Sequence, residues 1–227
     1  MHMEGFFNGE HVLVTGASGR LGRVVTETFG RSGAAVFGVD SDPSRAVVDR
    51  CYAADLTDEA SVSSLFKTLE KDGVSLRSVV HTVGMWDGRP LAETSAERWR
   101  LVMDVNLTST FLVFREALRL RIRLGVKDPL RLIAFASGQG ADRGRAQQAA
   151  YSASKAGVMR IVEAIAEEYG DDGVTAHAIA PSMILFDGME DEKGIPVQDL
   201  ANLCLILAGS AGEAVNGAVV RAYGTLR

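Results

Sequence analysis

Residues 11–22, HVLVTGASGRLG, decide the fold of this chain. A short apolar stretch runs into glycines at positions 16, 19 and 22, and a helical pattern begins at Arg20. In a strand–turn–helix unit of this kind, glycines let backbone N–H groups approach a pyrophosphate at the N-terminus of the helix. The stretch therefore predicts a dinucleotide-binding βα unit. A tight turn without a ligand is the alternative.

The remaining sequence repeats this alternation of strand and helix. We expect strands at 11–15, 35–40, 51–55, 76–84, 130–137, 174–181 and 217–224, and helices at 20–33, 58–73, 95–125, 150–170 and 197–209, with a break inside 95–125 as the alternative to one long helix. Strands that alternate with helices form parallel βαβ units, and continuous apolar strands are typical of sheets covered on both faces. We therefore predict an α/β fold, the doubly wound Rossmann arrangement, with a mostly parallel sheet of about seven strands and helices on both faces.

Length and composition favour one globular domain. The chain has 227 residues, of which 47% are hydrophobic, so we assign residues 1–227 to a single NAD(P)-binding domain with a short substrate loop near 182–196. A plain surface loop is the alternative for 182–196. The net charge of −5 argues against nucleic acid as a partner and gives no reason to expect an anionic membrane surface.

Membrane, metal and disulfide sites are not expected. No apolar run approaches the ~20 residues of a membrane span, and no signal-peptide core is evident, so we expect a cytoplasmic protein. The four histidines are dispersed without metal-ligand spacing, and the two cysteines, Cys51 and Cys204, are expected to be free thiols.

Asp40 ends the second expected strand, about twenty residues after the glycine turn. A carboxylate at this position can accept hydrogen bonds from the adenosine ribose and repels a 2′-phosphate. We therefore expect NAD(H) to be favoured over NADP(H), although Arg20 and Arg23 lie close in sequence and weaken that argument. The alternative is that Asp40 is only a solvated turn residue.

The stretch YSASKAG, residues 151–157, places Tyr151 and Lys155 four residues apart at the start of a helix. Residues with this spacing share a helix face. An ammonium group beside a phenol lowers the pKa of the phenol from its ordinary value of about 10. The pair is therefore predicted to be a tuned proton donor, although such pairs also occur on solvated helices.

Together these motifs resemble the short-chain dehydrogenase/reductase family over nearly the whole chain. The glycine turn is similar to TGxxxGxG, with Gly16 and Gly22 in place and Arg20 where the middle glycine usually stands. YSASKAG is similar to the YxxxK motif. IAPSMI (179–184) is similar to the family's PG turn, with Ser182 in place of glycine.

Three further segments carry the resemblance. DVNLTSTFLV (104–113) is similar to the segment with the catalytic asparagine, and FASGQG (135–140) to the strand end with the catalytic serine. HTVG (81–84) stands where many members have NNAG. The gap between Ser137 and Tyr151 is one residue longer than is common, which implies one extra loop residue between Gly140 and Ala149.

The resemblance implies an NAD(P)-dependent oxidoreductase that transfers a hydride between the cofactor and a small carbonyl or alcohol. Tyr151 would be the acid in reduction and the base in oxidation, and Ser137 would bind the substrate oxygen. Lys155 would lower the pKa of Tyr151 and hold the nicotinamide ribose. Asn106 would hold a water that links Lys155 to solvent.

The implied site residues fall into three groups. The catalytic residues are Asn106, Ser137, Tyr151 and Lys155. The cofactor-binding residues are Gly16, Ser18, Gly19, Arg20, Leu21, Gly22, Asp40, Asp55, Leu56, Val83, Gly84, Tyr151, Lys155, Pro181, Ser182 and Ile184. The substrate residues are Met85, Trp86 and Ser137, with a role as loop anchors as the alternative for the first two.

Two other functions stay open at this stage. The short C-terminal third resembles the compact dihydropteridine-reductase-like branch, which makes a pterin reductase the alternative within the enzyme class. A dinucleotide-sensing binding protein without turnover is the alternative from another class. The family resemblance also implies a homodimer or homotetramer in which helices 95–125 and 150–170 pair between subunits.

Overall fold

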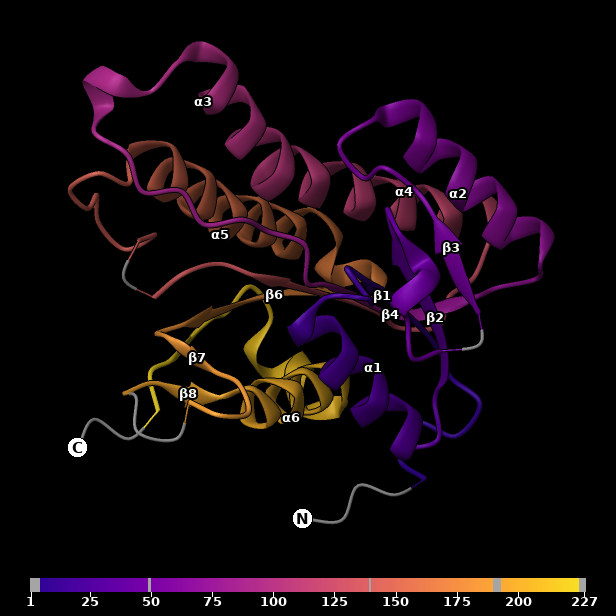
Figure 1. The fold of residues 1–227 in the computed structure, drawn as a ribbon. Helices are drawn as coiled ribbons and strands as arrows, with labels where there is room; N and C mark the ends of the chain where they lie inside the picture. The colour runs from indigo at the N-terminus through magenta and orange to yellow at the C-terminus, as the bar shows by residue number, and fades with distance from the viewer. Residues whose placement is uncertain (1–4, 49, 139, 190–192, 225–227) are drawn as a thin grey trace.

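One parallel sheet forms the centre of the molecule (Figure 1), in a computed structural model that describes residues 5–48, 50–138, 140–189 and 193–224. Its seven strands follow the order β3-β2-β1-β4-β5-β6-β9, and every neighbouring pair is parallel. The strands are β1 (His11–Thr15), β2 (Ala35–Asp40), β3 (Cys51–Ala53), β4 (Leu76–His81), β5 (Leu130–Phe135), β6 (Val174–Pro181) and β9 (Val219–Ala222). The predicted doubly wound sheet is thereby confirmed.

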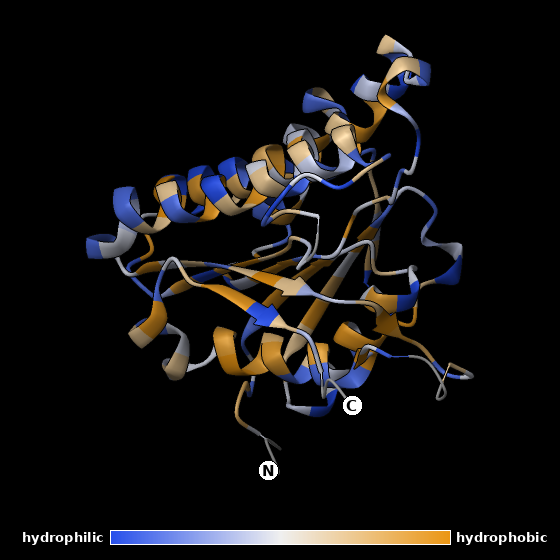
Figure 2. Ribbon diagram, turned by 90° about the vertical axis from the view of Figure 1, so that its left-hand side faces the viewer, coloured by the Kyte–Doolittle hydropathy of each residue, from blue (hydrophilic) through white to orange (hydrophobic). Residues whose placement is uncertain are grey.

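Helices cover both faces of this sheet. The helices are α1 (Arg20–Arg31), α2 (Glu59–Lys71), α3 (Ala96–Met103), α4 (Ser109–Leu124), α5 (Ala149–Tyr169) and α6 (Val197–Ala208). Apolar side chains of α2, α4 and α5 form one buried cluster with the sheet, and those of α1 and α6 form a second cluster on the other face. Figure 2 shows apolar strands between the two helical layers, as expected for strands covered on both sides.

Side-chain caps mark the start of two helices. Asp58 accepts a hydrogen bond from the N–H of Ser61 at the start of α2, and Ser95 accepts one from Arg98 at the start of α3. Helix α4 ends at Gly125, whose φ of 63° is readily adopted only by glycine. Helix α1, like α4, α5 and α6, has no side-chain N-cap hydrogen bond, and its N-cap residue is Gly19. The first N–H groups of α1 therefore have no side-chain cap.

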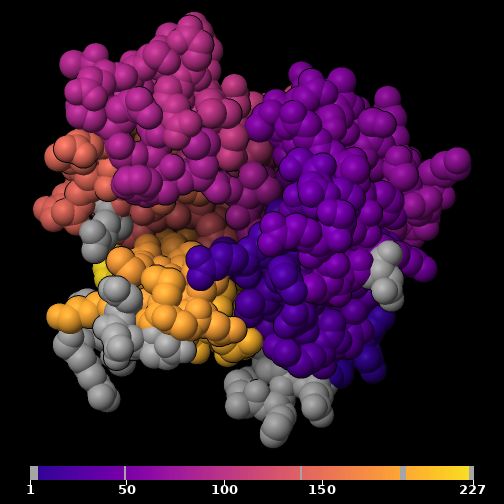
Figure 3. Space-filling model, in the orientation of Figure 1, coloured from indigo at the N-terminus to yellow at the C-terminus, as the bar shows by residue number. Residues whose placement is uncertain are grey.

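Two features add to the sequence-based expectation, which had left open a break in the long helix. The helix predicted at 95–125 is interrupted by a π-helical segment, η3 (Asp104–Thr108), between α3 and α4. The loop predicted at 182–196 contains two short paired strands, β7 (Ile184–Leu185) and β8 (Ile195–Pro196). On the face shown in Figure 3, this orange segment meets the indigo N-terminal part of the chain, where the ring of Phe186 lies against Arg20.

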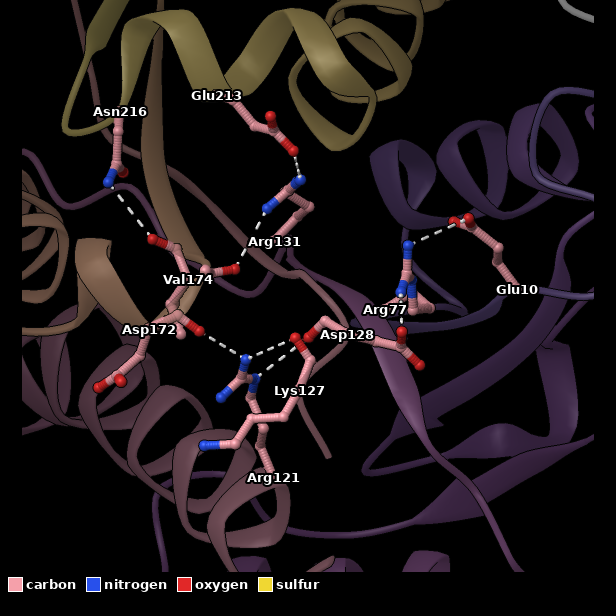
Figure 4. Close-up of polar contacts among 11 residues, drawn as sticks. Glu10, Arg77, Arg121, Lys127, Asp128, Arg131, Asp172, Val174, Glu213 and Asn216 are labelled. Atoms are coloured by element: carbon pink, nitrogen blue, oxygen red, sulfur yellow. Dashed lines mark hydrogen bonds and ion pairs between the residues drawn. The ribbon is translucent and has the colours of Figure 1, made fainter. Parts of the chain in front are cut away.

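Arginines tie the elements together near the N-terminal ends of the central strands (Figure 4). Arg131 of β5 forms an ion pair with Glu213 in the 3₁₀ segment η5 (Ser210–Val215). Arg77 of β4 lies 3.6 Å from Glu10 and 3.3 Å from Asp128. These contacts join β4, β5 and η5 at the edge away from the predicted catalytic residues.

Candidate active site

Two connected pockets lie at the carboxyl ends of the central strands, where doubly wound folds bind ligands. The larger is a cleft of about 560 Å³, lined by Gly16, Gly19, Arg20, Leu21, Gly22, Asp40, Ser41, Ala54, Asp55, Leu56, Thr57, Thr82, Val83, Gly84, Val105, Ile184 and Phe186. The smaller, of about 210 Å³, is lined by Leu21, Thr82, Gly84, Met85, Trp86, Phe135, Ala136, Ser137, Tyr151, Lys155, Pro181, Ser182 and Ile184. Because four residues line both pockets, a ligand in the cleft would extend into the smaller pocket.

The glycine turn between β1 and α1 has the close packing that its glycines were expected to provide. Gly16 has a φ of 70°, which disfavours a side chain there. A Cβ atom on Gly22 would lie 2.0 Å from the carbonyl oxygen of Gly16, so only glycine fits without moving the backbone. The two glycines therefore let the first turn of α1 pack against the end of β1. No side chain at these positions covers the backbone that lines the cleft.

Asp40 lines the cleft and also organises the glycine turn. Its Oδ2 atom accepts a hydrogen bond of 3.0 Å from the backbone N–H of Ser18, and its Oδ1 atom accepts one of 3.2 Å from Asp42. The Ser18 hydroxyl donates to the Asp42 carbonyl. Ser18 therefore ties the turn to the end of β2, and it is not among the residues that line the cleft.

Asp55 and Leu56 lie in the wall of the cleft, and their predicted role in binding the cofactor stays a prediction. The hydroxyl and the backbone N–H of Thr57 both donate to Asp55 Oδ1, and these bonds hold the pKa of the Asp55 carboxyl below its usual range. The carboxylate is thus held in a local turn, and the segment is fixed at the end of β3.

Asn106 lies buried in the π-helical segment η3, a distortion that often marks functional sites. Its Oδ1 atom accepts a 2.7 Å hydrogen bond from Met85 N–H, and its Nδ2 atom donates to the Met85 carbonyl and to Ser154 Oγ, each at 3.0 Å. Asn106 therefore fixes the backbone that follows β4 and joins it to α5. Its predicted role in holding a water stays a prediction.

Lys155 is buried in α5, and its ammonium donates a 2.7 Å hydrogen bond to the Phe135 carbonyl at the end of β5. Burial lowers the pKa of Lys155 to about 8. A Cβ atom on Gly84 would lie 3.0 Å from Lys155 Nζ and 3.2 Å from Asn106 Oδ1. The absence of a side chain at Gly84 therefore leaves space for both polar groups.

The pKa of Tyr151 departs from the expected direction. Burial raises the pKa of its phenol, and a hydrogen bond with the Ser137 side chain only partly opposes this effect. The expected fall in the pKa of Tyr151 is therefore wrong for the protein without cofactor. Desolvation of the phenolate outweighs the hydrogen bond from Ser137. A phenol with a raised pKa stays protonated at neutral pH and can donate.

Three residues that the motifs did not single out fix the loop after Ser137. The Tyr223 hydroxyl donates to the Gly138 carbonyl at 3.0 Å and lies 3.2 Å from Asp142 Oδ2. Arg221 of β9 forms two hydrogen bonds of 2.7 and 2.8 Å with the same carboxylate. Because these partners are about eighty positions apart in sequence, no local pattern could have identified them.

The loop between Gly140 and Ala149 was expected to hold one extra residue. Among the described residues, Gln147 is the only non-glycine with positive φ, at 63°, and its carbonyl accepts a hydrogen bond from Arg89 N–H. A residue other than glycine in this region is strained, and such strain is common near functional sites. This unusual geometry lies four positions before Tyr151.

His81, where many family members have asparagine, is fully buried between β1 and α4. Its ring nitrogens lie 2.8 Å from Thr15 Oγ1 and 3.0 Å from Ser109 Oγ. Burial, reinforced by the charge of Lys155, lowers the pKa of His81 to about 3, so the ring is neutral. Thr82 donates to the Thr15 carbonyl at 2.6 Å. Both residues therefore supply bonds between neighbouring elements.

Met85 and Trp86 lie in the wall of the smaller pocket, and their contact with substrate stays a prediction. Trp86 is 65% exposed, so most of its ring is available at the pocket mouth. No group of three or more His, Cys, Asp or Glu within the described ranges could hold a metal ion. Over the same ranges, no helix has the length and apolar character needed to cross a membrane.

Comparisons with known proteins agree with this geometry. The family model for short chain dehydrogenases matches residues 10–194. The 3-oxoacyl-[acyl-carrier-protein] reductase FabG of Vibrio cholerae is 30% identical over 216 residues, which cover 90% of this chain and 85% of the relative. A short-chain type dehydrogenase/reductase of Picea abies is 30% identical over 255 aligned positions, with 95% and 92% covered.

A solved structure gives the same result. A short chain dehydrogenase from Mycobacterium smegmatis aligns with a TM-score of 0.85 and 27% identity, covering 99% of this chain and 95% of that one. The family match spans most of the chain and includes Tyr151 and Lys155. The chain therefore belongs to the short-chain dehydrogenase/reductase family and is an oxidoreductase that uses a nicotinamide cofactor on small-molecule substrates.

Proposed function

We propose that this protein interconverts a small carbonyl compound and its alcohol, with Tyr151 as the acid in reduction and the base in oxidation. The observation that carries the proposal is the convergence of Ser137, Tyr151 and Lys155 in a pocket of about 210 Å³ that opens into the dinucleotide cleft. A substrate in this pocket would meet a hydroxyl donor beside the place where the nicotinamide would lie.

The residues of the pocket suit the charge changes of this reaction. The nicotinamide, when bound, supplies or accepts the hydride. Negative charge then develops on the carbonyl oxygen, and groups placed at that oxygen must stabilise it or protonate it. Tyr151 is protonated at neutral pH and can donate, and Ser137 offers a second hydroxyl. Lys155, fixed by Phe135, keeps an ammonium next to the site.

We also propose that NAD(H) is preferred over NADP(H). The carboxylate of Asp40 lines the cleft and would face a 2′-phosphate with like charge. The Arg20 guanidinium lies over the Phe186 ring, 3.7 Å from its centroid, so it is held by the segment between β7 and β8. Asp40→Asn should therefore lower the ratio of the Kd for NADPH to that for NADH, as measured by fluorescence titration. An unchanged ratio would contradict this assignment.

The experiment that tests the proposal is a screen of NADH and NADPH oxidation. Its substrates are 3-oxoacyl thioesters, which the FabG relatives suggest by name, together with quinones, simple ketones and a quinonoid dihydropterin. Tyr151→Phe should lower kcat by about 10²- to 10⁴-fold while NADH binding is retained, because only the proton donor is lost. Tyr169→Phe, at the far end of α5, is the matched control.

Each outcome decides between the functions that the sequence left open. Turnover that depends on Tyr151 would establish the carbonyl reductase, and the best substrate would choose between it and the pterin-type alternative. Full activity of Tyr151→Phe would remove Tyr151 from the mechanism. Tight dinucleotide binding without turnover on any substrate class would favour a dinucleotide sensor.

A further inference from the structure

The dinucleotide cleft is lined by few charged side chains, and most of these are acidic. Among the described residues that line it, Arg20 is the only cation, whereas Asp40 and Asp55 are anionic. Arg20 is also the first residue of α1, directly after an N-cap that has no side-chain hydrogen bond. A dinucleotide brings a doubly charged diphosphate to this end of the helix. Arg20 therefore supplies the side-chain positive charge at the position where it is needed.

The side chain of Arg20 reaches across the cleft to another part of the chain. Its guanidinium carbon lies 3.7 Å from the centroid of the Phe186 ring, and its Nη2 atom lies 4.0 Å from Met189 Sδ. Phe186 follows β7, and the hydrogen bond of 2.9 Å from Ile195 N–H to the Met183 carbonyl helps anchor this segment. Two segments far apart in sequence thus meet over one edge of the cleft (Figure 3).

Stacking leaves the hydrogen-bonding capacity of arginine intact. A guanidinium packs on an aromatic ring through its flat face, whereas its N–H groups point outward in its plane. A stacked arginine can therefore bind two phosphate oxygens at the same time. Lysine cannot combine these contacts, because its ammonium has no flat face.

We propose that Arg20 and Phe186 form a clamp on the diphosphate of the dinucleotide: Arg20 binds the phosphate oxygens, and Phe186 is the positioning residue that holds the guanidinium. This inference rests on the proposed use of a nicotinamide dinucleotide. Ile184, on the same segment as Phe186, lines both pockets. The segment that holds Arg20 therefore also forms part of the wall of the substrate pocket.

The test measures the Kd for NADH by fluorescence titration, and the dissociation rate by displacement, on the full chain. Phe186→Leu should weaken binding about two- to fivefold through faster dissociation, which is the range expected for a lost cation–π contact. Phe186→Tyr keeps the ring and should restore the affinity. Arg20→Met should weaken binding by about tenfold or more, because a charged hydrogen bond is lost.

Two controls separate the clamp from general charge effects. Arg23→Met removes the same charge three positions further along α1, from an exposed residue outside the cleft lining, and should leave the Kd unchanged. ADP-ribose, which carries the diphosphate, should lose affinity in Arg20→Met as NADH does. Adenosine, which has no phosphate, should bind Arg20→Met and the wild type equally.

A double variant decides whether the two residues act together. In the Arg20→Met background, Phe186→Leu should cause little further loss, since the cation that the ring holds is already gone. Full additivity, an unchanged Kd in both single variants, or an equal loss of adenosine binding would overturn the clamp while the proposed function stands. A wild-type protein that binds neither NADH nor NADPH would overturn the proposed function, and the clamp with it.

Discussion

The neutral imidazole of His81 bridges β1 and α4 deep inside the molecule, and its burial makes folding sensitive to acid. The pKa of His81 is lowered to about 3 in the folded state, and that of His177 to about 4, mainly by burial. Unfolded chains bind a proton at each ring near pH ~6.5. The unfolded state thus holds more protons between pH ~6.5 and these lower values, so stability is present above this window and is lost as pH falls through it.

His81→Asn, which restores the residue common in the family, should therefore flatten the decline of stability between pH 6.5 and 4.5. Each buried neutral histidine contributes a loss of about 1.4 kcal/mol per pH unit in this window. Denaturant unfolding at several pH values measures the slope directly. His11→Asn, at a partly exposed ring that accepts a hydrogen bond from Ser75, serves as control. An unchanged slope in His81→Asn would contradict the assignment of a neutral buried ring.

At the scale of an element, helix α1 contains two glycines with opposite packing. A Cβ on Gly22 would lie 2.0 Å from the Gly16 carbonyl oxygen, whereas nothing lies within 4 Å of a Cβ on Gly30. Gly22→Ala should therefore push α1 away from the turn, lower the Tm and weaken NADH binding. Gly30→Ala should stabilise the protein by about 0.5–1 kcal/mol, because alanine favours helix, without affecting NADH binding. Similar effects of both variants in calorimetry and titration would refute this picture of the turn.

At the scale of the whole molecule, apolar side chains remain exposed along α3 and α4. Leu101 is 44% exposed and Phe111 45%, on the helices that the family resemblance assigns to subunit pairing. We expect a dimer or larger assembly by light scattering after gel filtration, and Phe111→Glu should shift it toward the monomer. Glu27→Lys, a charge change on α1 at the opposite face of the sheet, should not. A monomeric wild type would contradict the pairing.

The alternation of strands and helices could be predicted because it depends on local pattern. Runs such as 174–181 are mostly apolar and buried at every position, so their register with neighbours hardly affects their identification. Tyr151, Lys155 and Ser137 were likewise found from short motifs, and the structure brings them into one pocket. The π-helical turn around Asn106 was not predicted, because it accompanies hydrogen bonds to Met85 and Ser154, which are distant in sequence.

Properties that depend on contacts in the folded chain, such as a shifted pKa, could not be predicted from the sequence either. The pKa of Tyr151 was expected to fall from the proximity of Lys155 and rises instead, because the number of atoms packed around the phenol cannot be read from helix spacing. The short pairing of β7 with β8 falls in a stretch without strand periodicity. Its register depends on contacts that only the folded chain supplies.

The attachment of Tyr223 to Gly138 has a consequence for how the protein is made. Ser137 and Tyr151 leave the ribosome well before β9, yet the loop between them is held by Tyr223 and by the pairing of Arg221 with Asp142. Domains generally fold as units. The loop after Ser137 can therefore be locked only after translation has passed Tyr223, when nearly the whole domain has been synthesised.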